Sequence, residues 1–140
     1  MKDIEIAKNE LKDNITCVLV KDEIIYKSEL KGIAPVMKCL NENIDLKGFS
    51  VADKVVGRAA AFLFIKAGIK EIYTEIISDG AIQLLNDYNI PFTYNTKVDK
   101  IINKTGDDIC PMEKTVINVD NHNPEEAYIL LNEKIKSLRK

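Results

Sequence analysis

The chain contains few of the residues that mark specialised proteins. Its 140 residues include no tryptophan, three cysteines and a single histidine, His122. The cysteines Cys17, Cys39 and Cys110 are odd in number and show no C-x-x-C spacing, so a disulfide framework is not indicated. Free thiols are typical of a reducing compartment, and we therefore expect a cytoplasmic protein.

The sequence also lacks the features of membrane and nucleic-acid partners. No segment reaches the roughly 18–20 consecutive apolar residues that span a bilayer, and the start MKDIEIAKNELK has no apolar core of a secretory signal. The 20 Lys and Arg against 22 Asp and Glu give a net charge of −2, without the basic excess of nucleic-acid binders. The length and the 46% apolar content predict one globular domain over residues 1–140.

Apolar spacing predicts helices and strands in the first half of the chain. We expect a helix over 2–12, a hairpin with strands over 15–20 and 24–27, and a helix over 33–43. The stretch 50–68 is the most apolar, and we predict that it forms one central helix. Ser50 and Asp53 match the S-x-x-[DE] pattern of a helix start, and Gly68 is suited to its end.

The second half predicts a parallel βαβ unit. Strands are expected over 72–77 and 92–94, with a helix over 81–88 between them. Residues 98–103 are expected to form a further strand or an edge segment, and 105–112 a loop. Pro124 opens a last helix, with Asn123 as its N-cap. Together these elements indicate an α/β protein with three α/β/α layers around a mixed sheet.

Two segments resemble a known family. The run ADKVVGRAAA at 52–61 and the CPME segment at 110–113 are similar to a small uncharacterised bacterial and archaeal family, a domain of unknown function assigned to the cytidine-deaminase-like fold. The resemblance covers most of the chain. It implies a mixed sheet flanked by helices, with the central helix placed where deaminases hold their metal. It also implies a homo-oligomer.

The residues themselves argue against conventional zinc deamination. Zinc deaminases need H-x-E or C-x-E at one helix start and P-C-x-x-C at the next. The corresponding positions near 51–55 and 77–81 read VADKV and ISDGA, which contain neither histidine nor cysteine. We therefore expect no metal and no cofactor, and the question whether the protein is an enzyme stays open.

The best candidate site lies at two helix starts, 50–54 and 78–81. In open α/β sheets ligands bind beyond the carboxyl ends of parallel strands, where the N–H groups of helix starts favour anions and polar groups. The expected ligand is nucleotide-like or another anionic or polar small molecule. On the alternative interpretation these residues are only helix caps. The expected lining is Ser50, Asp53, Lys54, Ser78, Asp79 and Gly80.

Arg58 is the only charged residue between Val55 and Ile65. A buried charge must reach water, a carboxylate or a ligand. Two roles are open: an ion pair with Glu75 of the following strand, or a clamp on an anionic ligand. Gly57 beside it is expected to allow another backbone or a ligand to approach closely.

The CPME segment has a less defined role. Cys110 could act as a nucleophile only with a nearby base, and Glu113 could contribute to the site from this loop. We favour a structural turn in which Met112 packs inward. Three functions remain open: a small-ligand-binding protein, a metal-independent enzyme of unknown reaction using Asp53, Lys54 or Cys110, and a structural or interaction protein.

Overall fold

The computed structural model describes residues 1–138 and is built around a mixed sheet of five strands. The strand order is β2-β1-β3-β4-β5. Strand β1 (Cys17–Lys21) is antiparallel to both β2 (Ile24–Ser28) and β3 (Ser50–Val56), whereas β4 (Glu71–Ser78) and β5 (Phe92–Val98) continue parallel to β3. The predicted α/β class with a mixed sheet is therefore confirmed.

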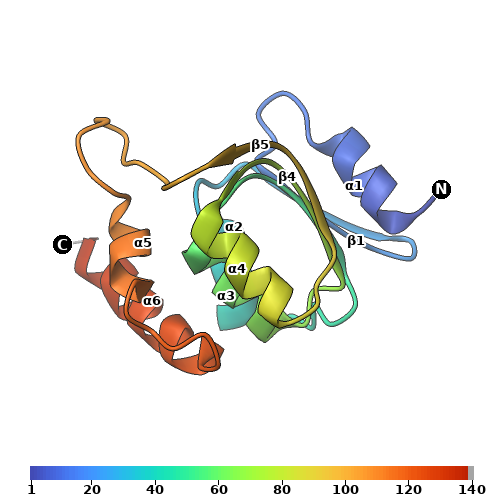
Figure 1. Ribbon diagram of the computed structural model, residues 1–140. Coiled ribbons are helices and arrows are strands. Elements are labelled where there is room, and N and C mark those ends of the chain that lie inside the picture. Colours follow the sequence, from blue (N-terminus) through green and yellow to red (C-terminus); the bar gives the residue numbers. More distant parts are fainter. Residues whose placement is uncertain (139–140) are drawn as a thin grey trace.

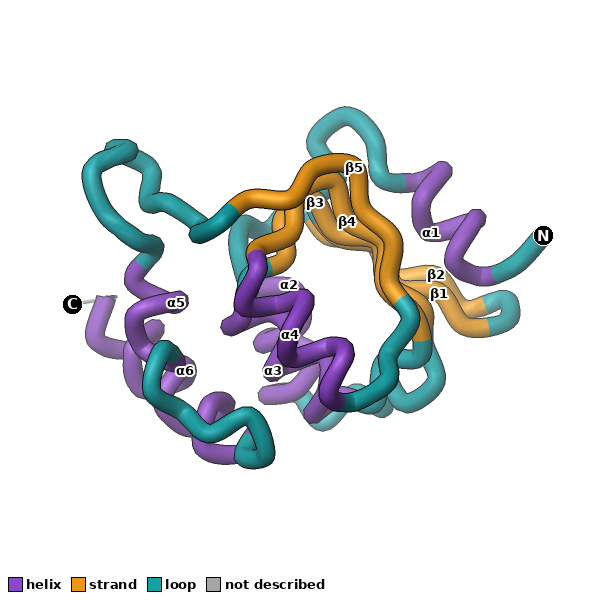
Figure 2. Tube along the Cα trace, viewed as in Figure 1, coloured by secondary structure: helices purple, strands orange, loops and turns teal. Residues whose placement is uncertain are grey.

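Helices cover both faces of this sheet, as Figure 1 shows. Helix α1 (Asp3–Glu10) lies alone on one face. On the other face the sheet arches over α2 (Ala34–Asn41), α3 (Arg58–Ala67) and α4 (Asp79–Asp87), as seen in Figure 2. Helices α5 (Pro111–Val116) and α6 (Pro124–Leu138) pack against α3 on the side away from the sheet.

The core is divided by the sheet. The larger cluster surrounds α3, whose Phe62, Leu63 and Phe64 are fully buried because the sheet, α4 and α6 enclose this helix. The smaller cluster joins Ala7 and Leu11 at α1 to the other face of β1, β3 and β4. The prediction of a central, largely buried helix is thus confirmed for residues 58–67.

The prediction of a helix over 50–57 is wrong. Residues 50–56 form β3, the middle strand, and Ser50 lies opposite Val20 of β1 and Glu71 of β4. The backbone hydrogen bonds of this segment are made to neighbouring strands, so the match to a helix-start pattern at Ser50 and Asp53 has no counterpart in the structure. Sheet pairing overrides the local pattern here.

The alternation of side chains between the two faces of the sheet is interrupted within β3 and β4, where the sheet curves over the helices. Val51 and Val56 both belong to the core around α3, although an odd separation places two residues of a regular strand on opposite faces. Between them, Asp53 lies opposite Thr74, and Thr74 Oγ1 donates a hydrogen bond to the Ile76 carbonyl at 3.0 Å. These two buried polar residues therefore mark the point where the strands bend.

The other predicted elements are found within a few residues. The hairpin, the parallel βαβ unit and the last helix are confirmed, and Asn123 Oδ1 caps α6 by accepting from Glu126 N–H at 3.1 Å. Residues 98–103 form no full strand: beyond Val98, the last residue of β5, only Ile102 pairs, in an isolated bridge with Ile109. Within residues 1–138, none of the helices has the length and apolar character to cross a bilayer.

Candidate functional site

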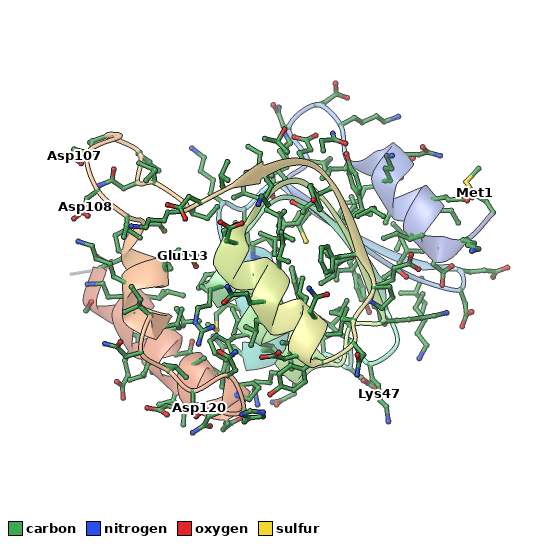
Figure 3. The ribbon with its side chains drawn as sticks, viewed as in Figure 1. Met1, Lys47, Asp107, Asp108, Glu113 and Asp120 are labelled. Carbon is green, nitrogen blue, oxygen red and sulfur yellow. The ribbon has the colours of Figure 1, made fainter. Side chains whose placement is uncertain are left out.

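The start of α3 is capped by a side chain from a distant part of the chain. Glu113, on α5, accepts hydrogen bonds from Arg58 N–H at 2.8 Å and from Ala59 N–H at 2.7 Å, one to each carboxylate oxygen. Figure 3 labels Glu113 beside α5. Because the first N–H groups of a helix have no acceptor within it, this carboxylate occupies the place that an anionic ligand would take.

Gly57 makes this approach possible. A Cβ atom at this position would lie 2.3 Å from Glu113 Oε1 and 2.6 Å from its carboxyl carbon, far inside van der Waals contact. The expectation that Gly57 permits a close approach agrees with the geometry, but the approaching group is a side chain of the same protein.

The side chain of Arg58, at the start of α3, binds in turn to the end of α5. Its Nε donates to the Val116 carbonyl at 3.1 Å and its Nη2 to the Val119 carbonyl, at and beyond the end of α5. The guanidinium also stacks on the Phe62 ring, 4.6 Å from the centroid. We call this pair of contacts the reciprocal cap: Glu113 caps the start of α3, and Arg58 caps the end of α5.

Burial and the neighbouring charges act in opposite directions on the pKa values of Glu113 and Arg58. Burial raises the pKa of the Glu113 carboxyl, whereas the hydrogen bonds from Ala59 and Arg58 N–H and the Arg58 charge act in the opposite direction. Burial also lowers the pKa of Arg58, opposed first by Glu113. Each charge thus favours the ionised form of the other side chain. The hydrogen bonds of both side chains are made to backbone groups.

The start of α4 is built differently, from a local cap. Ser78 ends β4, and its side chain accepts a hydrogen bond from Ala81 N–H at 3.2 Å. Asp79 and Gly80 follow as the first two residues of the helix, where N–H groups have no acceptor within it. Asp79 pairs with Lys97 of β5 at 3.3 Å. The predicted helix start near 78–81 is confirmed.

A small cavity of about 130 Å³ lies between these two helix starts. It is located beyond the carboxyl ends of the parallel strands, where α/β sheets place their ligands. Its wall combines the two starts with the segment that follows β5 and with α5. The lining residues are Arg58, Ser78, Gly80, Asp99, Lys100, Ile101, Ile109, Glu113 and Ile117.

The structure brings together only part of the predicted site. Arg58, Ser78, Gly80 and Glu113 line the cavity, whereas Asp79, between Ser78 and Gly80 in the chain, is not part of the lining. Ser50, Asp53 and Lys54 lie in β3 and do not line it, because the segment 50–54 is a strand and the helix begins at Arg58. Lys54 Nζ donates instead to the Asp13 carbonyl at 3.0 Å.

The proposed pair of Arg58 and Glu75 does not form. Within residues 1–138, no ion pair joins them, because the guanidinium is held by carbonyls at the end of α5. Glu75 is half-buried in β4. The interior arginine thus reaches backbone carbonyls of its own chain instead of a carboxylate or a ligand.

Asp53 is nevertheless unusual, because it is buried without an ion pair in the described chain. Burial raises its pKa to about 8, and hydrogen bonds from the Lys54 and Val55 N–H groups only partly oppose this. The carboxyl therefore remains largely protonated near neutral pH. Its neighbour across the strands is Cys17, whose thiol pKa is also raised by burial.

Nothing in residues 1–138 assembles a metal site: no group of three or more His, Cys, Asp and Glu side chains is suitably placed. Cys110 directly precedes α5 and is half-buried. His122 Nδ1 contacts Asp120 at 3.1 Å and stands exposed. The CPME segment is the start of a helix, not a turn, and Met112 packs on the core as expected.

Sequence reasoning missed the residues that close the cavity from the other side. Asp99 and Lys100 follow the carboxyl end of β5, so the rule that ligands bind at such ends could have indicated them. Ile101, Ile109 and Ile117 carried no comparable signal, because their positions depend on how the segment after β5 folds back.

Comparisons with known proteins place the chain in a family. The family model TM1506, a domain of unknown function (DUF1893), matches residues 6–135. A solved structure of a DUF1893 family protein, TM1506 from Thermotoga maritima, is 31% identical, with a TM-score of 0.79 over 93% of this chain and 85% of that one. None of the curated proteins matches this chain. The chain therefore belongs to the DUF1893 family.

Proposed function

We propose that this protein binds a compact polar ligand in the cavity between the starts of α3 and α4. The observation that carries the proposal is the location of the cavity at the carboxyl ends of β3 and β4, next to the N–H groups at the start of α4. Lys100 contributes a positive charge to its wall, and Gly80 leaves the helix start open.

The size of the cavity restricts the ligand. Sites for drug-sized molecules occupy roughly 300–1,000 Å³, whereas this cavity measures about 130 Å³. A nucleotide-like ligand would place only its base or one phosphate inside, and the remainder would extend past Lys100 toward solvent. The N–H groups at the start of α3 are already bound by Glu113, so the ligand would be held from the α4 side.

A cytidine-deaminase-like architecture without the zinc chemistry is part of this proposal. Supporting it are the single antiparallel strand β1, which lies between β2 and β3 in an otherwise parallel sheet, and the helices on both faces. The candidate nucleophiles and bases do not converge, which favours binding over catalysis. Asp53 and Lys54 are consecutive in β3, and Cys110 lies outside the cavity lining.

A structural or interaction role is the second candidate, and the reciprocal cap favours it. Glu113 binds the free N–H groups at the start of α3 and so holds α5 against this helix. Such a contact stabilises the fold and leaves no free N–H group there for a ligand. The predicted self-association fits this alternative, since the edge strand β2 exposes Ile24, Ile25 and Tyr26. Light scattering across micromolar concentrations tests it: a monomer throughout would contradict self-association.

The binding proposal is tested by titrating cytidine, cytidine monophosphate and inorganic phosphate separately while recording amide chemical shifts. We expect saturable changes centred on Ser78, Gly80 and Lys100. A Cβ at Gly80 would meet its nearest neighbour, the Arg58 Cβ, at 3.6 Å, so Gly80→Ala keeps the fold while narrowing the cavity.

Gly80→Ala should weaken binding of the responding probe, and Asn86→Ala, exposed on the same helix, should not. If Gly80→Ala and Asn86→Ala bound the probe equally well, the ligand would not lie in the cavity between the starts of α3 and α4. No response to any of the three probes, with the cavity amides unchanged, would favour the structural role.

A further inference from the structure

A second, larger hollow lies between α2 and α6. Its volume is about 680 Å³, within the range of small-molecule sites. At one end it is closed by hydrogen bonds between the two helices: Asn41 and Asn132 exchange side-chain bonds of 3.0 and 3.1 Å, and Tyr128 donates to Asn41 at 2.6 Å. We call this hollow the α2–α6 groove.

The interior of the α2–α6 groove is apolar. Ile33, directly before α2, and Met37 of α2 line it together with Ile135 of α6 and Met112 of α5. Leu30 and Leu138 stand at the open end with 45% and 57% of their surface exposed. Unbranched methionine side chains adapt to flexible ligands, so this lining suits an extended alkyl chain better than a rigid ring.

The rim of the groove is positively charged. Lys31, Lys38, Lys104 and Lys136 line it, against the single acidic residue Glu42. Within residues 1–138, none of these lysines forms an ion pair. The whole chain carries a net charge of −2, so this local excess of positive charge contrasts with the rest of the molecule. It favours the binding of an anionic group at the rim.

We propose that the α2–α6 groove binds a free long-chain carboxylate. The alkyl chain lies on Ile33, Met37, Met112 and Ile135, and the carboxylate meets lysines at the open end. Burial of each CH₂ group contributes about 0.8 kcal/mol, so affinity rises with chain length. A hollow closed at one end by Asn41 and Asn132 accepts a single chain, whereas a lipid bilayer would require a protruding apolar surface.

The test uses dodecanoate below its micellar concentration, measured by titration calorimetry on the full chain. We expect one molecule bound per chain, with weaker binding of hexanoate and of the uncharged dodecanol. Replacing Lys31, Lys104 and Lys136 together by Gln should weaken dodecanoate binding about tenfold or more, because charge-assisted contacts are lost.

The matched control replaces the exposed Lys2, Lys12 and Lys70 by Gln, which changes the net charge equally. Ala34→Phe, which fills the lined groove from α2, should abolish binding while the far-ultraviolet circular dichroism stays unchanged. Equal weakening by the two lysine triples would overturn the proposal. So would unsaturable uptake of dodecanoate, or binding only to anionic phospholipid vesicles. None of these variants touches the cavity of the proposed function, so the two proposals fail independently.

Discussion

The starts of α3 and α4 lie at the same end of the sheet but are stabilised by opposite means. The cap of α4 is Ser78, three residues before the N–H that it binds. The cap of α3 is Glu113, 55 and 54 residues after its two N–H donors. A local cap belongs to its helix, whereas a distant cap ties two parts of the fold together, so their removal should have different consequences.

The largest effect should follow removal of the distant cap. Glu113→Ala leaves the N–H groups of Arg58 and Ala59 without their charged acceptor, which should lower the free energy of unfolding by about 3 kcal/mol. Urea denaturation measures this. Glu133→Ala, exposed on α6, serves as the control and should stay within about 0.5 kcal/mol. Similar values for both variants would show that Glu113 is not a functioning cap.

Gly57→Ala should act by displacing the same carboxylate. Its Cβ would lie 2.3 Å from Glu113 Oε1, too close for both atoms to stay in place, so we expect a loss of stability of about 2 kcal/mol. The double variant Gly57→Ala with Glu113→Ala should be no less stable than Glu113→Ala alone, because the clash disappears with the side chain. Additive losses in this double-mutant cycle would contradict the steric explanation.

The pH dependence of stability distinguishes the expected from the observed environment of Asp53. At a helix start, its carboxylate would be favoured and stability would rise with pH. Buried in β3 with a pKa of about 8, Asp53 binds its proton more tightly in the folded state. Stability should therefore fall as pH rises from about 4 to 8, by at most about 1.4 kcal/mol per unit.

Thermal unfolding from pH 5 to pH 7 measures this slope. Asp53→Asn should flatten it, whereas Glu23→Gln, in the exposed turn after β1, should leave it unchanged. The prediction would be contradicted if the stability of the unmodified protein rose with pH. It would also be contradicted if Asp53→Asn left the pH slope of stability unchanged.

The smallest effect is expected at the local cap. Ser78→Ala removes one neutral hydrogen bond to Ala81 N–H and should cost about 1 kcal/mol, measured by urea denaturation. Ser137→Ala near the end of α6 provides the comparison and should change stability by less than about 0.5 kcal/mol. A loss at Ser78 as large as that at Glu113 would remove the contrast between the two helix starts.

The same contrast explains how much could be predicted from the sequence. Ser78 and Asn123 were recognisable as caps because their partners lie three residues ahead. Glu113 was assigned to the site only as a loop contribution, since no local pattern links it to Gly57. Of the fold, the mixed sheet, the hairpin and the βαβ unit followed from apolar spacing and turn residues.

The boundary between β3 and α3 is where local reasoning failed. Ser50 and Asp53 match the pattern of a helix start, although both are buried in a strand of the sheet. Two signals pointed the other way: the β-branched Val51, Val55 and Val56 before Gly57, and the alanines after it. The closing of the cavity by Ile101, Ile109 and Ile117 depends on long-range packing and carried no such signal.

The reciprocal cap also links the opening of two distant segments. The N–H groups of Arg58 and Ala59 are bound only while α5 remains docked on α3, and β4, α4 and β5 all lie between these segments in the chain. Partial detachment of α5 would expose both amides to solvent while the sheet stayed intact. Their hydrogen-exchange rates therefore measure how often the C-terminal helices separate from the rest of the protein.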